Sequence, residues 1–141
     1  MPESHRKMIQ EVRDKDSNIK GRSVLLVDDD MRNAFALSKF LKSRGMNVTI
    51  ANNGKKALEI LEKEGTPDII LMDIMMPVMD GYETMKEIRK RKEFKDLPIL
   101  ALTAKAMESD REECIRCGAS DYLSKPINTT KLLSMLRIWM Y

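Results

Sequence analysis

The chain has 141 residues, of which 43% are hydrophobic and 33% are charged, and its formal net charge is +3. This size and composition fit one globular domain that can bury a core without disulfides or a structural metal. Apolar runs no longer than a strand argue against a transmembrane helix, and the even spread of basic residues argues against binding to nucleic acid or directly to a membrane.

Residues 1–20 are rich in charge and contain few apolar positions, among them Met8, Ile9 and Val12. Such a segment cannot bury enough apolar surface to fold, so we expect a flexible charged linker or tail over 1–20 and one domain over 21–141. The segment also lacks the apolar centre of a secretory signal peptide, which predicts a cytoplasmic protein.

From Gly21 onward, short apolar runs alternate with helical patterns. The predicted strands are Ser23–Val27, Met46–Ala51, Asp68–Met72, Ile99–Leu102 and Asp121–Leu123. The predicted helices run from Asp30 to Gly45, from the turn at Asn52–Gly54 to Gly65, and over Tyr82–Lys92, Met107–Cys117 and Thr129–Met140. Connections of this length imply parallel strands joined right-handedly, with helices on both faces. The predicted fold class is therefore α/β, a three-layer αβα sandwich.

Two of the predicted strands end in carboxylates. Val24–Val27 leads into Asp28 and Asp29, and Ile69–Met72 leads into Asp73 just before a proline-containing turn. If these strands are parallel neighbours, the three side chains converge, and two like charges about 4 Å apart repel by roughly 4 kcal/mol at an effective dielectric near 20. A cluster of oxygen ligands with few protein carboxylates is typical of a Mg²⁺ site.

Two further side chains are expected at the same edge of the sheet. Thr103 follows the fourth strand and Lys125 follows the fifth. A carboxylate can attack a phosphoryl group to form an acyl phosphate, while cations and hydroxyls neutralise and position its oxygens. The pattern predicts phosphoryl transfer with Asp73 as nucleophile, Lys125 offsetting negative charge and Thr103 donating a hydrogen bond.

Four motifs together resemble the receiver domain of two-component response regulators. They are Val-Asp-Asp (27–29), Met-Asp-Ile-Met-Met-Pro-Val-Met-Asp-Gly (72–81), Leu-Thr-Ala (102–104) and Tyr-Leu-Ser-Lys-Pro (122–126). The match in order, spacing and residue type covers about Gly21 to Tyr141. The resemblance implies a flavodoxin-like fold with a five-stranded parallel sheet in the order 2-1-3-4-5, which places the acidic cluster at the topological switch point.

The resemblance also implies roles for the residues of the metal site. Asp73 would accept a phosphoryl group from a phosphohistidine on a histidine kinase or a histidine phosphotransfer domain. Asp28 and Asp29 would hold Mg²⁺ together with Asp73 and the main-chain carbonyl of Met75. Lys125 would pair with the phosphoryl group and with Asp73.

A conformational switch is implied in the same way. Thr103 and Tyr122 would be the switch pair, and the Lys125–Pro126 bond would be cis. The surface of the fourth helix, fifth strand and fifth helix would pass the signal on. A homodimer formed through this surface is one way of doing so. The domain alone would be a phospho-acceptor rather than a turnover enzyme.

A narrower similarity concerns the segment Asp28–Leu37 and the ending near Leu136–Trp139. Both are similar to receivers at the C-terminal end of hybrid sensor histidine kinases. Residues 1–20 would then be a tether from the kinase part of a parent protein associated with a membrane. The alternative is a stand-alone single-domain regulator, and in either case we expect no DNA-binding output domain after the last helix.

Two functions of other classes compete with a switch domain. An Asp-nucleophile phosphatase would need a second acid two residues after the nucleophile, where this chain has Met75. A degenerate receiver acting as a scaffold would be expected to lack Asp73, Thr103 or Lys125, and all three are present.

Three smaller features have ordinary structural interpretations. Cys114 and Cys117 form a Cys-Ile-Arg-Cys segment, which could be a redox pair but is expected to hold two reduced thiols. Asp30 is expected to cap the first helix rather than extend the metal site. Asp80 and Gly81 are expected to shape the turn before the third helix.

Overall fold

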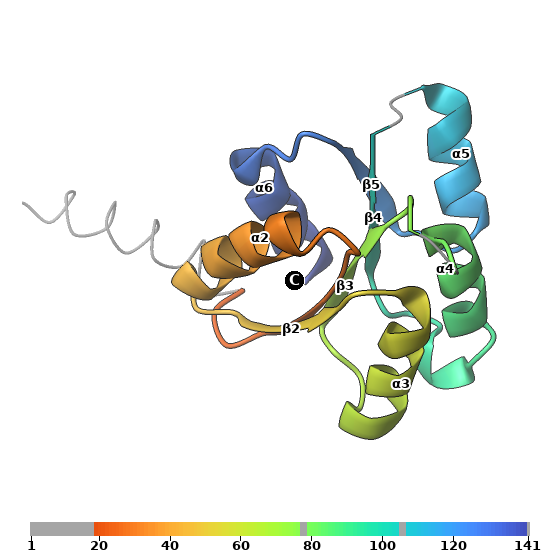
Figure 1. Cartoon of the computed structure of the whole chain (residues 1–141), viewed down its shortest axis with the longest axis horizontal. Helices are drawn as coiled ribbons and strands as arrows, with labels where there is room; N and C mark the ends of the chain where they lie inside the picture. The colour runs from red at the N-terminus through yellow and green to blue at the C-terminus, as the bar shows by residue number, and fades with distance from the viewer. Residues whose placement is uncertain (1–18, 77–78, 105–106, 141) are drawn as a thin grey trace, which may run out of the picture.

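The computed structural model of the chain describes residues 19–76, 79–104 and 107–140. Its strands are β1 (Ser23–Val27), β2 (Asn47–Ala51), β3 (Ile69–Asp73), β4 (Ile99–Thr103) and β5 (Asp121–Ser124). They form one parallel sheet in the order β2-β1-β3-β4-β5 (Figure 1). The predicted fold class and strand order are confirmed.

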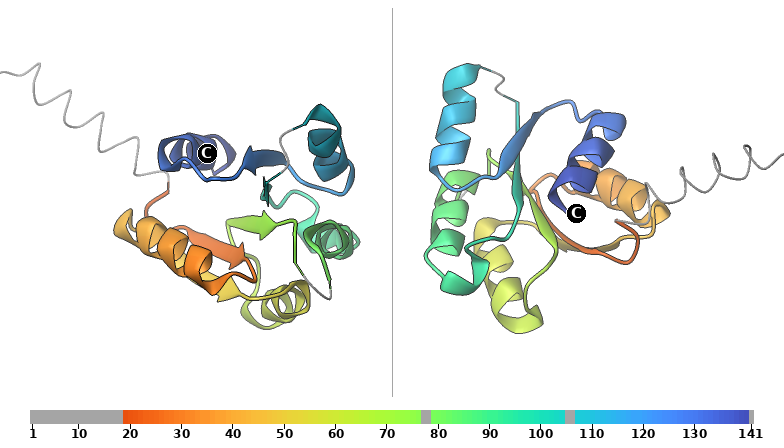
Figure 2. Two further views of the ribbon diagram at one scale, coloured as in Figure 1. Left: turned by 45° about the horizontal axis from the view of Figure 1, so that its top comes forward. Right: turned by 180° about the vertical axis from the view of Figure 1, so that it is seen from behind.

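Helices cover both faces of the sheet. They are α2 (Met31–Ser43), α3 (Gly54–Glu64), α4 (Gly81–Arg89), α5 (Glu108–Arg116) and α6 (Thr129–Trp139), with a short 3-10 helix η1 (Lys92–Phe94). Figure 2 shows α2 and α6 on one side of the sheet and α3, α4 and α5 on the other. Alternate residues of β1 follow this division, since Val24 and Leu26 pack toward α2 and α6 whereas Leu25 and Val27 pack toward the other three helices.

The central strands are covered on both faces. Every residue of β3 and of β4 is buried, including the two polar residues at their ends, Asp73 and Thr103. A buried polar group is costly unless it has partners, so these two residues indicate a functional site at the C-terminal ends of β3 and β4. None of the described helices is long and apolar enough to span a membrane.

Side-chain caps start four of the helices. Asp30, Asn53, Asp80 and Asn128 each accept a hydrogen bond from a main-chain N–H in the first turn of α2, α3, α4 and α6. These caps satisfy N–H groups that have no partner inside the helix, and each is worth about 1 kcal/mol. The remaining α-helix, α5, begins after Met107, which makes no such bond.

The third predicted helix, Tyr82–Lys92, is wrong at its end. The helix α4 stops at Arg89, and η1 follows after two residues. Phe94 is 2% exposed and belongs to the core, so the chain leaves the helix in order to bury that ring. The Arg89 guanidinium stabilises the segment after α4, since its Nη1 donates hydrogen bonds to the main-chain oxygens of Phe94 and Lys95.

The predicted linker over residues 1–20 includes two described residues. Ile19 is fully buried in the core beneath α2 and α6, and its main-chain oxygen accepts a hydrogen bond from the N–H of Arg22 at 3.1 Å. Residues 1–18 lie outside the described ranges. Among the described residues, the packed core therefore begins at Ile19, inside the segment predicted as linker.

Candidate functional site

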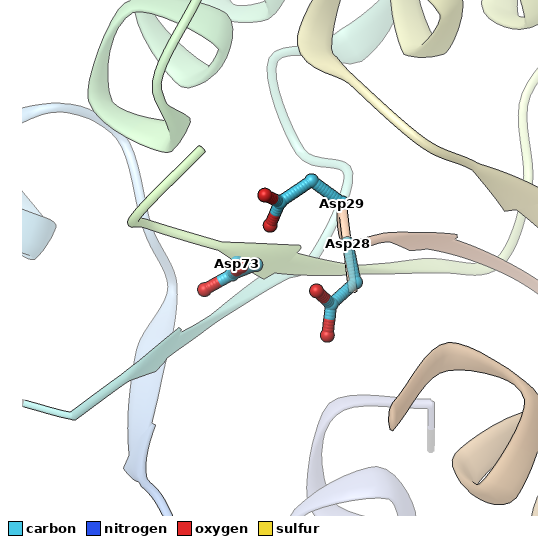
Figure 3. Close-up of side chains that lie close together, drawn as sticks. All are labelled: Asp28, Asp29 and Asp73. Carbon is cyan, nitrogen blue, oxygen red and sulfur yellow. The ribbon is translucent and has the colours of Figure 1, made fainter. Parts of the chain in front are cut away.

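Three carboxylates meet at the C-terminal ends of β1 and β3. Val27 of β1 pairs with Met72 of β3, so Asp28 and Asp73, which follow them, lie at the same end of neighbouring strands. One carboxylate oxygen each from Asp28, Asp29 and Asp73 lies within 4.8 Å of the other two. Figure 3 shows these three side chains close together. The convergence of acids predicted from the two strand ends is present in the structure.

Asp73 is the most constrained of the three acids. Its side chain is 4% exposed, and its Oδ1 accepts hydrogen bonds from Lys125 Nζ at 3.0 Å and from the main-chain N–H of Met75 at 3.3 Å. Burial raises the pKa of the Asp73 carboxyl above its ordinary value; the bond to Lys125 and its charge oppose that rise, whereas the charge of Asp28 adds to it. The rise therefore comes first from burial, and the contact with Lys125 does not cancel it.

The donor set at this edge fits a hard divalent cation. Three carboxylates share the pocket with one ammonium group, and all available side-chain ligand atoms there are oxygens. Few protein carboxylates with room for water suit Mg²⁺, which prefers oxygen ligands and keeps part of its hydration shell. The residues present are thus compatible with the predicted ion.

The loop after β1 separates the clustered acids, Asp28 and Asp29, from the capping acid, Asp30. Asp28 Oδ1 accepts from the N–H of Asp30 at 2.9 Å, which fixes the turn. Asp30 accepts from the N–H of Arg32 at 3.0 Å and from Asn33 Nδ2 at 3.3 Å. Asp30 therefore caps α2, as predicted, and is not part of the acidic cluster.

Thr103 and Lys125 come from adjacent strands and are held in register. Thr103 is 1% exposed at the end of β4 and pairs with Ser124 of β5. The main-chain oxygen of Thr103 accepts from the N–H of Lys125 at 2.7 Å. The Lys125–Pro126 bond is cis, as expected. Pairing of the two strands thus brings the hydroxyl and the ammonium to the edge that carries Asp73.

Gly81 closes the loop that follows Asp73. Its N–H donates to the main-chain oxygen of Ile74 at 3.0 Å, and Asp80 caps α4 by accepting from the N–H of Glu83 at 2.9 Å. A Cβ at Gly81 would lie 2.5 Å from the main-chain oxygen of Asp73 and 2.7 Å from Ile74 Cα. The turn therefore requires glycine for close approach of the backbone, and no left-handed conformation is involved.

A groove beside the site was not predicted from the sequence. It has a volume of about 590 Å³ and lies between α2 and the segment after β5. Its lining is mostly apolar, with Asp28 and Lys125 among its members: Asp28, Asn33, Ala36, Leu37, Phe40, Leu102, Lys125, Pro126, Ile127 and Thr129. The spacing of Asn33, Leu37 and Phe40 along one face of α2 could have indicated it.

The remaining predicted site residues lie further out. Tyr122 is half-buried on β5, and the guanidinium carbon of Arg111 lies 5.6 Å from the centre of its ring. The side chain of Met75 is 61% exposed. Cys114 and Cys117 are free, buried thiols, and the one candidate group of metal ligands in the described ranges is the acidic cluster. The expectation of reduced thiols is consistent with this structure.

Comparisons with known proteins agree on one family. The family model "Response regulator receiver domain" matches residues 24–137. The "uncharacterized 14.6 kDa protein in sodA1 3'region" of Leptolyngbya boryana is 40% identical over 81% of this chain and 86% of its own length. The transcriptional regulatory protein CpxR of Escherichia coli K12 is 38% identical, and the sensor histidine kinase CheAY of Helicobacter pylori is 36% identical, each over 81% of this chain. The chain spans only 47% of CpxR and 14% of CheAY.

Solved structures similar to this chain belong to the same family. A putative response regulator from Chloroflexus aurantiacus J-10-fl superposes with a TM-score of 0.81 at 34% identity, over 86% of this chain and 98% of that one. The receiver domain of sensor histidine kinase PA1611 from Pseudomonas aeruginosa PAO1, with a magnesium ion in its active site cleft, gives 0.78 at 39% identity over 85% and 98%. The Saccharomyces cerevisiae Ssk1 receiver domain, crystallised with the histidine phosphotransfer protein Ypd1, gives 0.79 at 31% identity over 86% and 90%. With this strand order and acidic edge, the chain belongs to the response regulator receiver domain family of two-component signalling.

Proposed function

We propose that this chain is a phospho-accepting switch domain in which Asp73 receives a phosphoryl group from a phosphohistidine. The observation that supports this most strongly is the environment of Asp73. Its carboxylate is buried at a strand end, shares a pocket with Asp28 and Asp29, and accepts a hydrogen bond from Lys125. A structural role alone would not require two further acids, Asp28 and Asp29, beside one buried carboxylate.

The proposed step is a direct transfer. A carboxylate oxygen of Asp73 attacks the phosphorus, a P–O bond forms, and the P–N bond to the donor imidazole breaks. The imidazole nitrogen keeps the electron pair and takes up a proton. Lys125 would pair with the negative phosphoryl oxygens of the resulting acyl phosphate, and the Thr103 hydroxyl would move to donate a hydrogen bond to one of them.

Mg²⁺ is the proposed cofactor. Asp28, Asp29 and Asp73 would hold it together with the main-chain carbonyl of Met75. When bound, the ion supplies positive charge that offsets the phosphoryl oxygens. The acidic cluster and the magnesium ion coordinated in the similar PA1611 receiver domain support this assignment.

The proposed donor is a histidine kinase or a histidine phosphotransfer domain. Met31 and Phe35 of α2 and Met75, which follows Asp73 by two residues, are exposed apolar residues, and other residues of α2 line the groove described above. Exposed apolar side chains at a reaction site are typical of a docking surface. The similar Ssk1 receiver domain was crystallised with a histidine phosphotransfer protein, which supports the same kind of partner here.

We consider two kinds of protein in which this domain would act. We place it in a hybrid sensor histidine kinase, acting on the cytoplasmic side, because a kinase receiver domain and the CheAY kinase are among its relatives. A stand-alone regulator is the second candidate, favoured by the Leptolyngbya protein, 86% of whose length this chain covers. The full open reading frame distinguishes them, since only the first setting has a kinase core upstream. An Asp-nucleophile phosphatase is not proposed, because the position of its second acid is occupied by Met75.

The experiment that tests the acceptor role uses beryllofluoride, a phosphoryl mimic, with Mg²⁺. The wild-type chain and an Asp96→Asn control should bind it, because Asp96 is exposed and lies outside the acidic cluster. Asp73→Asn should not bind. Equal binding by wild type and Asp73→Asn would overturn the proposal.

A further inference from the structure

Among the described α-helices, α5 buries the fewest residues. It buries one residue, Cys114, whereas α2, α3 and α6 each bury three residues and α4 buries four. It is also the one described α-helix whose N-cap residue, Met107, makes no side-chain hydrogen bond to the first turn. Few buried contacts and a missing cap both lower the free energy needed to displace a segment.

One contact joins this helix to the predicted switch residue. The guanidinium carbon of Arg111, in α5, lies 5.6 Å from the centre of the Tyr122 ring, in β5. This is the distance of a cation–π interaction, which stabilises the ring where the guanidinium can cover it. Tyr122 pairs with Ala101 of β4, two residues before Thr103. The contact therefore connects a weakly held helix to the strands that end at the acidic edge.

We infer that Arg111 acts as a latch that holds the Tyr122 ring in the position seen here. It thereby sets the equilibrium between the two ring positions in the unmodified domain. This inference rests on the proposed function, in which Thr103 moves toward the phosphoryl group, and on the predicted switch pair, whose second member Tyr122 would then turn its half-buried ring further inward. Here Lys125 is bonded to Asp73 itself, the arrangement expected of an unmodified acceptor. Arg111 is exposed, and following the ring inward would remove its charge from water, so the contact breaks when the ring moves.

The first measurement reports on the ring without any phosphoryl mimic. The protein is labelled with fluorotyrosine, and the ¹⁹F resonance of Tyr122 is assigned as the one that Tyr122→Phe lacks. Arg111→Met keeps the apolar stem and removes the charge, so it should shift the ring population about two- to fivefold, the change expected for one exposed cation–π contact. Arg111→Lys should restore part of the shift. Arg116→Met is the matched control, because Arg116 lies on the same helix but pairs with Glu113 at 2.8 Å, and it should leave the resonance unchanged.

The second measurement tests whether the effect passes through the ring. Arg111→Met should bind beryllofluoride with Mg²⁺ about two- to fivefold more tightly than wild type, since less free energy holds the ring in its resting position. In a Tyr122→Ala background the same substitution should change nothing.

Two results would overturn the latch. One is an unchanged Tyr122 resonance in Arg111→Met, and the other is an affinity gain that persists in the Tyr122→Ala background. Failure of the wild type to bind beryllofluoride would instead contradict the proposed function, and the ring measurement would still decide the role of Arg111.

Discussion

The ammonium nitrogen of Lys125 lies 3.0 Å from Oδ1 of Asp73, a residue 52 positions earlier in the chain, and the Asp73 side chain is 4% exposed. A hydrogen bond between two charged groups at a buried carboxylate contributes more than a neutral one. If Asp73 were phosphorylated, the same ammonium would be close enough to pair with a phosphoryl oxygen.

Replacing Lys125 with Ala separates metal binding from switching. Mg²⁺ binding should be retained, because the three carboxylates remain, whereas beryllofluoride affinity should fall by about tenfold to a hundredfold, as expected for losing one charge-assisted hydrogen bond. Calorimetric titration with Mg²⁺, and then with beryllofluoride, measures both. Lys131→Ala removes the same charge from an exposed position on α6 and should match wild type. Unchanged beryllofluoride affinity in Lys125→Ala would show that the lysine has another role.

Gly81→Ala should destabilise the domain by about 1–3 kcal/mol, the usual cost of forcing extra volume into a packed position. The added Cβ would meet the backbone of Asp73 and Ile74, which cannot rotate away as a side chain can. Urea unfolding measures the change. Thr129→Ala, at the first position of α6, is exposed and should stay within about 0.5 kcal/mol of wild type. Comparable stability of the two variants would mean that the loop after β3 can relax.

Tyr82 should make stability fall at alkaline pH. Burial, followed by the charge of Cys114 and its hydrogen bond, raises the pKa of Tyr82 from 10.0 to about 12. The folded protein therefore favours the neutral phenol, so this contribution is complete below pH 10.0 and is lost as the pH rises toward 12. Urea unfolding over this range should show a steeper loss for wild type than for Tyr82→Phe. Parallel losses in the two proteins would contradict the prediction.

The two thiols should be inert in the folded protein. Cys114 and Cys117 are 0% and 2% exposed, and burial raises the pKa of both thiols. Alkylation should be slower in the native state than in urea by about 100-fold or more, since it requires local opening. Ser109→Cys places a thiol on the exposed face of α5 and should react rapidly in the native state. Rapid native alkylation of wild type would revive the redox interpretation of this pair.

Most of the fold follows from local patterns in the sequence. Each strand begins within one residue of its predicted start, because apolar runs bounded by Gly, Pro and Asp have few other structures available. The end of α4 could not be predicted in the same way. Nothing near Arg89 breaks a helix, and the chain turns there because Phe94 is buried and distant main-chain oxygens accept from Arg89.

Some features of the site could likewise be predicted from the sequence, and others could not. Asp28, Asp29, Asp73, Thr103 and Lys125 could be placed at one edge because each follows a recognisable strand. The burial of Ile19 and the contact of Arg111 with Tyr122 could not, because each depends on how an isolated residue packs against another element. Patterns locate elements, whereas contacts between elements require the folded structure.

The most direct test of the central claim is to locate a phosphoryl group on the chain. Incubation with acetyl phosphate and Mg²⁺, followed by mass spectrometry of proteolytic peptides, should place the modification on Asp73 and should find none in Asp73→Asn. Modification at another residue, or equal labelling of Asp73→Asn, would contradict the account.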